Sequence, residues 1–565
     1  MPGSAPGIAR DRWGGRLDWL LILAGFVSVG YCYFMYLYRT DELIHADIAT
    51  EILTGREMFR QKTIFLSQYY HSTEMFLVRS SMFMALWTFL TDDMIATYSL
   101  AVATDIALMA FSFAYMARRL GAGPKATAFG ILAFFGSRTY VSGLFTGMGG
   151  SSYGTMCATV FIVIGYYAAS RLGKRNRVDT AMRFVLPVLA FLFGLSSMRF
   201  LATVFVPLIA AHAASKLWSR LPSDWRGDRL LGEMLAWTAL SAIGAFVTKT
   251  FIVPLGFGPF EYQTLAANGL AVIWTEHFPE LIKEIASYNP AVRALGGFSP
   301  ATVAGATGLS CLGFYAACAW GLASTTTAVR PARVAVYRFL LLSLAVATLA
   351  MMLLFTDVRF INLRYLVFGY VLMALVAALF YEDLLRSNPA VARAFLCLSS
   401  FFFALNSVMN VKDIPAYIAS NPSRVVVRHT AEIEAALSRH GIKRAYSLYW
   451  NSSVETVLTN ARVEVSPVMG NMGPLRYLTN YETYSPERAG DRTAFLMIDL
   501  LPDPAFAHLP QFNITNRALL DTCSFKEIIP DPEADIEIMY FDRNPFTFPP
   551  GHDPADEYSP IELAK

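Results

Sequence analysis

The first residues in the chain that could do chemistry are two adjacent acids, Asp41 and Glu42, which directly follow the first long apolar segment. Two carboxylates at the boundary between membrane and water are costly to keep charged unless they are used or paired. One hypothesis is therefore a reactive site. The other is a helix cap together with solvated acids at the membrane boundary, in which Asp41 caps a helix start. At this point both remain open.

A short amphipathic segment follows the acid pair. Isoleucines recur at every fourth position from Ile44 onward, and Asp47 and Glu51 lie on the opposite, polar face. This pattern predicts a helix that lies on the membrane surface, with Asp41 at its start. Gly55 suits the end of that helix, because glycine readily adopts the left-handed conformation that stops one.

Two histidines, His45 and His71, belong to the same loop as the acid pair. Together with Asp41 and Glu74 they could ligate a cation. Isolated histidines on surface helices more often contact lipid headgroups, so no cofactor is expected and a divalent metal is disfavoured. The six cysteines show no CxxC pair and no regular spacing, so neither a disulfide framework nor a zinc site is indicated.

The composition places these residues in a membrane protein. Of the 565 residues, 55% are hydrophobic and 16% are charged, and the mean hydropathy is +0.41. A soluble domain carries about 25% charged residues. These values exclude a disordered chain, a nucleic-acid binder and an ordinary cytosolic enzyme. Residues 411–565 contain 14 Lys and Arg against 21 Asp and Glu, a net charge of −7, so the preceding part carries +10 of the total of +3.

The sequence predicts about 11 membrane-spanning helices, because each needs about 20 mostly apolar residues. Arg10, Arg12 and Arg16 precede the first, which reads as a retained signal anchor with a cytoplasmic N-terminus. The predicted spans are residues 19–38, 94–116, 126–145, 153–170, 181–196, 200–215, 231–253, 301–323, 337–355, 362–381 and 390–408.

A further apolar stretch, residues 75–90, is predicted to lie on the membrane surface rather than to cross it. If it crossed, the basic clusters at Arg118 and Arg171 would face outward, against the bias of short cytoplasmic loops toward positive charge. Arg79, in the middle of the stretch, also fits an interfacial helix. The resulting odd number of spans puts the C-terminal part on the outer face.

The predicted fold is thus a polytopic α-helical membrane protein with a C-terminal extracytoplasmic α/β domain. Its parts are a cytoplasmic tail (residues 1–16), a transmembrane domain (17–410) with a long first outer loop (39–93), and the α/β domain (411–565). In the α/β domain the sequence predicts a helix at 430–439 and buried strands at 444–450, 462–467 and 494–500. From Asp542 onward, proline and acidic residues predict a loose tail.

An acid pair directly after the first span, a long first outer loop, surface helices and an outer C-terminal domain together resemble the GT-C glycosyltransferases. The relatives in view are the protein mannosyltransferases, aminoarabinose transferases and oligosaccharyltransferases. The sharpest motif is Asp41-Glu42, followed by Ala46-Asp47-Ile48-Ala49. The resemblance implies transfer of a sugar from a polyprenyl-phosphate carrier to a glycan, lipid or protein acceptor. The site would lie on the periplasmic face of the inner membrane.

The resemblance also assigns roles to residues. Asp41 would be the base that takes the proton of the acceptor hydroxyl, and Glu42 would orient the acceptor. His45, Asp47 and His71 are further candidates on the acceptor side. Arginine binds phosphate through two parallel hydrogen bonds, so four residues at the outer ends of spans are candidates for the donor phosphate. These are Arg199, Arg359 and Arg364, with Tyr365 next to Arg364 in an Arg-Tyr pair that resembles a feature of GT-C enzymes. The alternative for the arginines, which remains open, is an ion pair with Asp357 or contact with lipid headgroups.

One departure and two alternatives bear on this interpretation. The second outer loop of oligosaccharyltransferases carries acids that help to bind a metal, whereas residues 146–154 here contain none. A transporter or flippase of a lipid-linked glycan would need ionisable residues deep in its spans, and the sequence offers Asp105, for which a buried hydrogen bond is the favoured role. A non-catalytic envelope-assembly protein would not need the acid pair.

Overall fold

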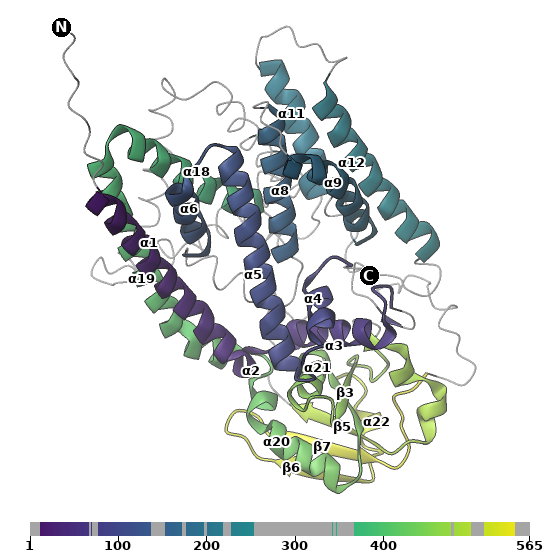
Figure 1. The fold of residues 1–565 in the computed structure, drawn as a ribbon. Coiled ribbons are helices and arrows are strands. Elements are labelled where there is room, and N and C mark those ends of the chain that lie inside the picture. The colour runs from purple at the N-terminus through teal and green to yellow at the C-terminus, as the bar shows by residue number, and fades with distance from the viewer. Residues whose placement is uncertain are drawn as a thin grey trace, which may run out of the picture.

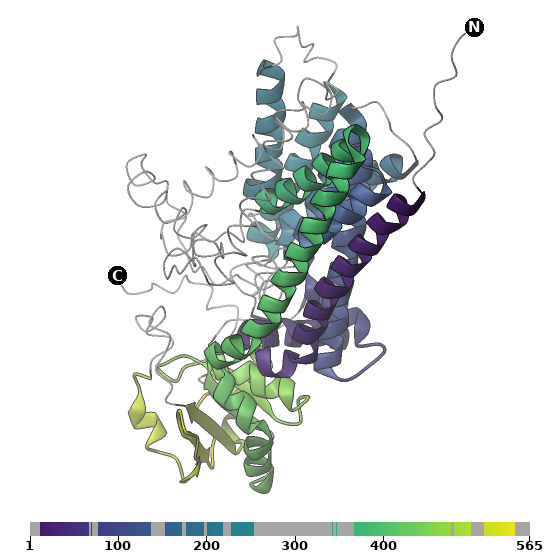
Figure 2. The same cartoon turned by 90° about the vertical axis from the view of Figure 1, so that its left-hand side faces the viewer.

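The computed structural model has a bundle of long helices with an α/β domain at one end (Figure 1). A view from the side shows the same arrangement (Figure 2). The residues described are 12–66, 69–70, 77–136, 153–171, 177–196, 201–218, 228–252, 342, 346, 367–475, 479–498 and 514–548. The predicted spans 301–323 and 337–355 lie outside the described residues, apart from Leu342 and Val346.

The bundle consists of apolar helices that match nine of the predicted spans within the described residues. Five of them, α1, α5, α9, α12 and α19, are long and apolar enough to cross a membrane. The helices are α1 (Arg12–Tyr38), α5 (Met94–Arg119), α6 (Pro124–Gly136), α8 (Tyr153–Arg171), α9 (Arg177–Ser196), η1 (Leu201–Phe205) with α11 (Val206–Trp218), α12 (Arg229–Val247) with η3 (Thr248–Ile252), α18 (Val367–Ser387) and α19 (Pro389–Ser420).

Small residues allow the helices of the bundle to approach closely. A Cβ atom added at Gly194 of α9 would lie 2.0 Å from the carbonyl oxygen of Ser241 in α12, and one at Gly244 would lie 2.5 Å from that of Phe191. Only glycine permits these backbones to come so near, which is a common packing device between membrane helices. Helices α1 and α19 also run side by side (Figure 1, Figure 2).

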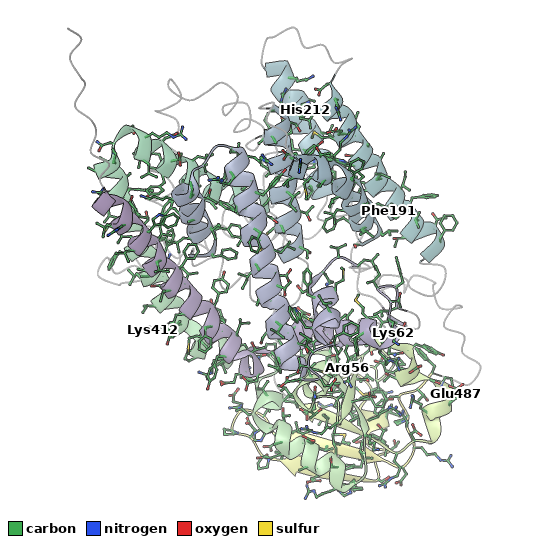
Figure 3. The ribbon with its side chains drawn as sticks, in the orientation of Figure 1. Arg56, Lys62, Phe191, His212, Lys412 and Glu487 are labelled. Atoms are coloured by element: carbon green, nitrogen blue, oxygen red, sulfur yellow. The ribbon has the colours of Figure 1, made fainter. Side chains whose placement is uncertain are left out.

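Basic side chains gather at the end of the bundle that is remote from the α/β domain. Asp18, near the start of α1, contacts Lys125 at 2.5 Å and Arg393 at 3.4 Å. The opposite end of the same helix pair is marked by Tyr36 and Tyr417, whose rings lie 6.4 Å apart. Figure 3 also places His212 of α11 far from the α/β domain.

The first loop forms a layer between the bundle and the α/β domain. Its elements are α2 (Thr40–Leu43), α3 (Ala46–Gln61), the short strand β1 (Tyr69–Tyr70) and α4 (Ser80–Trp87). Helix α3 lies across the direction of the long helices (Figure 1). Strand β1 pairs with β4 of the α/β domain, with Tyr69 opposite Asn480, so the loop and the domain share a small sheet.

The α/β domain contains a five-stranded mixed sheet in the order β3-β2-β5-β7-β6. Strands β3, β2 and β5 are parallel, and β7 is antiparallel to both β5 and β6. Its elements are α20 (Arg424–Arg439), β2 (Arg444–Leu448), α21 (Tyr449–Leu458), β3 (Glu464–Val468), β4 (Thr479–Asn480), η9 (Tyr481–Tyr484), η10 (Pro486–Gly490), β5 (Thr493–Ile498), α22 (Arg517–Leu520), β6 (Phe525–Ile529) and β7 (Ile536–Phe541).

The strands β2, β3 and β5 confirm the three that were predicted, to within two residues at each end. Two other predictions are wrong in detail. The predicted span at residues 390–408 and the predicted boundary after residue 410 are both too early, because helix α19 continues without a break past Val411 to Ser420. The chain after Asp542 is not loose as far as residue 548, because Phe546 and Phe548 are buried in the core of that domain.

Candidate functional site

The acid pair lies on a short helix that turns the chain from the bundle into the first loop. Helix α2 ends at Leu43, and Ile44 and His45 are extended before α3 begins at Ala46. The predicted single helix is therefore two helices with a corner between them. The cap predicted for Asp41 is wrong, because Asp41 is in the first turn of α2 and the N-cap residue is Arg39, whose side chain makes no capping hydrogen bond. The solvated acid that the same alternative predicted agrees with the exposure of Asp41.

The two acids of the pair differ in their surroundings. Glu42 is bound by Arg39, whose Nε donates to Oε1 over 2.6 Å and whose Nη2 forms a second contact. The side chain of Asp41 is exposed, and within the described part of the chain its carboxylate has no hydrogen bond or ion pair. Of the two carboxylates, Asp41 is thus the one that is open to solvent and has no polar partner in the described part of the chain.

His45 and Asp47 lie at the start of α3, next to the corner. Burial lowers the pKa of His45, and the nearby charge of Asp47 opposes this shift only in part. The imidazole is therefore neutral at pH 7, and its Nδ1 atom is shielded from solvent without a hydrogen-bond partner among the described residues. Asp47 is engaged, because the hydroxyl of Tyr449 in α21 donates to its Oδ1 over 2.7 Å.

The polar face predicted for this helix is buried rather than solvated. Thr50, Glu51 and Thr54 are all buried, and Oε2 of Glu51 lies 2.5 Å from Nη2 of Arg79. The backbone N–H of Ser81 donates to the other oxygen of Glu51 over 2.9 Å. Burial raises the pKa of Glu51, but the charge of Arg79 and the hydrogen bonds of Ser81 and Arg79 oppose the shift.

The helix predicted at residues 75–90 is shorter than predicted, and its arginine is buried rather than at the membrane surface. Among the described residues it is reduced to α4, which begins at Ser80, and Arg79 is its extended N-cap residue with a side chain that is only 4% exposed. Arg79 is buried because its charge is paired with Glu51, which the interfacial hypothesis did not include. The hydroxyl of Ser80 donates to Asp105 of α5 over 2.6 Å, which confirms the buried hydrogen bond predicted for Asp105.

Gly55 does not end the first-loop helix. Helix α3 continues to Gln61 and stops at Lys62, which has a positive φ of 55°. A Cβ atom at Gly55 would lie 2.6 Å from the Cβ of Met84 and 2.8 Å from the carbonyl oxygen of Ser81. The glycine therefore serves the close contact between α3 and α4, which keeps Glu51 next to Arg79.

Several predicted site residues lie outside the described residues and stay predictions. They are His71, Arg199, Arg359, Arg364 and Tyr365. No group of three or more His, Cys, Asp or Glu side chains that could hold a metal ion occurs in the part of the chain that the structure describes.

Residues that the sequence analysis did not single out complete the surroundings of the acid pair. Asn421, at the end of α19, donates from its side-chain amide to the carbonyl oxygens of Glu42 and Ile44. Tyr449 reaches Asp47 from the α/β domain. Both residues are about 380 to 400 positions away in the chain, and no local pattern connects them with the first loop.

The helical bundle, the acid pair at one end of it and the α/β domain at the same end together make up a fold that has solved counterparts (Figure 1). No protein-family model matches the sequence, and the comparison with curated proteins finds no match. The fold is similar to the crystal structure of ArnT from Cupriavidus metallidurans bound to undecaprenyl phosphate, with a TM-score of 0.54 and 11% sequence identity. That similarity covers 96% of this chain and 100% of the other.

A second solved structure, of ArnT from the same organism in the apo state, gives a TM-score of 0.52 at 12% identity and covers 93% of this chain and 97% of the other. These identities are low, so the similarity concerns the fold. At that level it confirms the resemblance predicted from the acid pair and the predicted topology.

Proposed function

We propose that this chain is a multi-pass membrane glycosyltransferase that moves a sugar from a polyprenyl-phosphate carrier to an acceptor on the outer face of the cytoplasmic membrane. The observation that carries the proposal is a fold shared over 96% of the chain with ArnT, combined with the exposed Asp41 at the junction of bundle and α/β domain. The similar ArnT structure contains undecaprenyl phosphate, which supports a lipid phosphate of this kind as the carrier.

In the proposed reaction, Asp41 takes the proton of an acceptor hydroxyl, which is a poor nucleophile until it loses that proton. The acceptor oxygen forms a bond to the anomeric carbon while the bond from that carbon to the phosphate oxygen breaks. The lipid phosphate leaves with the bonding electron pair and needs no proton. The transition state has oxocarbenium character, and a single displacement inverts the anomeric centre.

Glu42 is proposed to orient the acceptor. Its ion pair with Arg39 holds the carboxylate next to Asp41 in the chain. Both side chains are part-exposed, so an acceptor hydroxyl can hydrogen-bond to the Glu42 carboxylate while the ion pair remains. The departing phosphate is proposed to bind Arg199, Arg359, Arg364 and Tyr365, since guanidinium groups keep their charge in a poor dielectric.

The orientation in the membrane is part of the proposal and rests on charge. Lys125, Arg386 and Arg393 lie at the end of the bundle remote from the α/β domain, where Asp18 and Glu382 pair with them. Lysine and arginine near span ends favour the cytoplasmic side. The first loop and the α/β domain would then face the periplasm.

The function is tested with the full chain in native membranes, which supply acceptors. Labelled undecaprenyl-phosphate-linked mannose and aminoarabinose serve as donors, and the release of undecaprenyl phosphate is measured. Sugar transfer that occurs only in membranes containing this protein supports the proposal. Movement of the intact donor across the membrane without release of undecaprenyl phosphate contradicts it. Arg364→Ala should weaken donor binding, and an unaltered donor affinity would count against the phosphate site.

A further inference from the structure

Asn421 connects the end of α19 to the corner between α2 and α3. Its Nδ2 donates to the carbonyl oxygen of Glu42 over 3.1 Å and to that of Ile44 over 2.7 Å. Its Oδ1 accepts from the backbone N–H of Ser423 over 2.9 Å. The residue is only 5% exposed. The side-chain amide of Asn421 therefore uses both its hydrogens and its oxygen in hydrogen bonds to backbone groups.

The carbonyl oxygens at the corner between α2 and α3 need hydrogen-bond donors from another part of the chain, because the corner has too few backbone N–H groups placed to bond them. The last carbonyl groups of a helix have no partner within that helix, and α2 has only four residues. Ile44 is extended, with ψ of 134°, so the chain does not continue as a helix. Asn421 supplies a donor to each of the carbonyl oxygens of Glu42 and Ile44, to which no backbone N–H of the described residues donates.

This contact fixes the backbone on the C-terminal side of Asp41. On its N-terminal side the hydroxyl of Thr40 donates to the carbonyl oxygen of Leu37 over 2.9 Å, which ties α2 to the end of α1. The backbone of Asp41 is therefore held from both directions, while its side chain stays exposed. This is the arrangement expected when a reactive group must keep one position.

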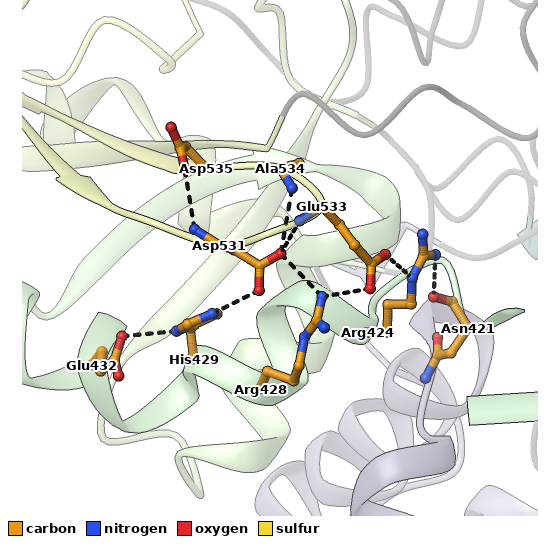
Figure 4. A network of polar contacts seen from close by, with 9 residues as sticks. All are labelled: Asn421, Arg424, Arg428, His429, Glu432, Asp531, Glu533, Ala534 and Asp535. Atoms are coloured by element: carbon orange, nitrogen blue, oxygen red, sulfur yellow. Dashed lines mark hydrogen bonds and ion pairs between the residues drawn. The ribbon is translucent and has the colours of Figure 1, made fainter. Parts of the chain in front are cut away.

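Asn421 is itself held by the α/β domain (Figure 4). Arg424 donates from Nη1 to the carbonyl oxygen of Asn421 over 3.1 Å and from Nε to Glu533 over 2.5 Å. Arg428 contacts Glu533 at 2.9 Å and Asp531 at 3.1 Å. A chain of contacts thus runs from the loop between β6 and β7 through α20 to the corner that carries Asp41.

We infer that Asn421 is a positioning residue for the transfer reaction, through which the α/β domain sets the position of Asp41. The inference rests on the proposed function, because that function makes Asp41 the base. A displacement of the base by about 1 Å is enough to lower a rate by about a hundredfold. The α/β domain would then take part in catalysis without touching the sugar.

Asn421→Asp tests the inference with almost no change of size. It removes both amide hydrogens and sets a carboxylate against two carbonyl oxygens. The matched control is Ser423→Ala, which removes the neighbouring hydrogen bond to the carbonyl oxygen of Trp450 and leaves the corner alone. Two quantities are measured on the full chain. One is hydrogen exchange of the backbone amides of Glu42 and Leu43, which donate to the carbonyl oxygen of Arg39. The other is kcat and KM for labelled undecaprenyl-phosphate-linked mannose and aminoarabinose.

The expected result for Asn421→Asp is amide exchange at Glu42 and Leu43 that is faster by about tenfold or more. The expected kcat falls by about tenfold or more while KM for the donor changes less than about twofold, because the variant acts on the base and not on donor binding. Ser423→Ala should change neither quantity. If Asn421→Asp has the same amide exchange rates and the same kcat as Ser423→Ala, the inference is overturned.

A separate variant distinguishes this failure from failure of the proposed function. If Asp41→Asn turns over like the wild type, the proposed base is wrong and the inference falls with it. If Asp41→Asn is inactive while Asn421→Asp retains full kcat, the base stands and Asn421 does not position it.

Discussion

The hydroxyl of Tyr449 donates a hydrogen bond of 2.7 Å to the carboxylate of Asp47, from a position 402 residues further along the chain. This bond joins α21 of the α/β domain to the start of α3 in the first loop. The domain is therefore attached to the candidate site by a specific polar contact as well as by apolar packing of Ala46, Tyr449 and Leu475.

Tyr449→Phe should lower the free energy of unfolding by about 1 kcal/mol, because it removes one hydrogen bond to a charged group that is only half-buried. The measurement is the thermal unfolding of the detergent-solubilised chain. The control is Tyr31→Phe, at a side chain that is 55% exposed on α1. Equal unfolding temperatures for the two variants would show that the bond to Asp47 does not stabilise the domain interface.

The buried ion pair between Glu51 and Arg79 predicts a non-additive mutant cycle. The two side chains are 1% and 4% exposed. Arg79→Met alone leaves a buried carboxylate without its cation and should cost about 3–5 kcal/mol of unfolding free energy. The double variant Glu51→Gln/Arg79→Met should recover part of that loss. A double variant as unstable as the sum of the two single variants would contradict the pairing.

Glu455 predicts a pH dependence of the α/β domain. It is fully buried in α21, and burial raises the pKa of its carboxyl well above the ordinary value of 4.5. The nearby hydroxyl of Thr430 compensates little, since it already donates to the carbonyl oxygen of Val426 over 2.9 Å. The charge of Glu434 raises the pKa further.

The folded state therefore binds this proton more tightly than the unfolded state, and stability falls as the pH rises above about 4.5 toward the raised pKa. Glu455→Gln should remove this loss, so its unfolding temperature should fall less than that of the wild type between pH 5 and pH 8. Glu487→Gln, an exposed site in the same domain, should follow the wild type. Parallel curves for all three proteins would show that Glu455 is already ionised.

His429 also predicts a stability that falls as the pH rises, but in a higher pH range than Glu455. Burial lowers its pKa, but hydrogen bonds to Asp531 at 2.9 Å and Glu432 at 2.8 Å outweigh this and raise the pKa above 6.5. The stabilisation by its charged form is present below pH 6.5 and is lost as the pH rises through the raised pKa. His429→Gln should thus destabilise the chain at pH 6 more than at pH 9, by thermal unfolding. An equal loss at both values would contradict a charged His429.

The sequence predicted the parts of the molecule that depend on local pattern. Helices α1, α5, α8 and α9 follow long apolar runs, and β2, β3 and β5 follow short buried runs between turn residues. The acid pair was found because it follows directly on the first span. Hydropathy and adjacency are properties of neighbouring residues, which a sequence displays directly.

Contacts between distant residues explain what the sequence did not show. Arg79 appeared to suit a membrane surface because its partner, Glu51, is 28 positions earlier on another helix. Gly55 resembled a helix end, whereas its small size is needed against Met84. Asn421 is one asparagine in a stretch without a motif, and its role follows from where α19 ends relative to α2.

The most direct test of the proposed function is the turnover of Asp41→Asn. Asparagine keeps the shape of the side chain but is not a base, so sugar transfer from undecaprenyl-phosphate-linked donors should fall by about a hundredfold or more while donor binding is retained. Asp92→Asn, which alters another exposed acid of the same loop, should transfer at the wild-type rate. Wild-type turnover by Asp41→Asn would contradict the account.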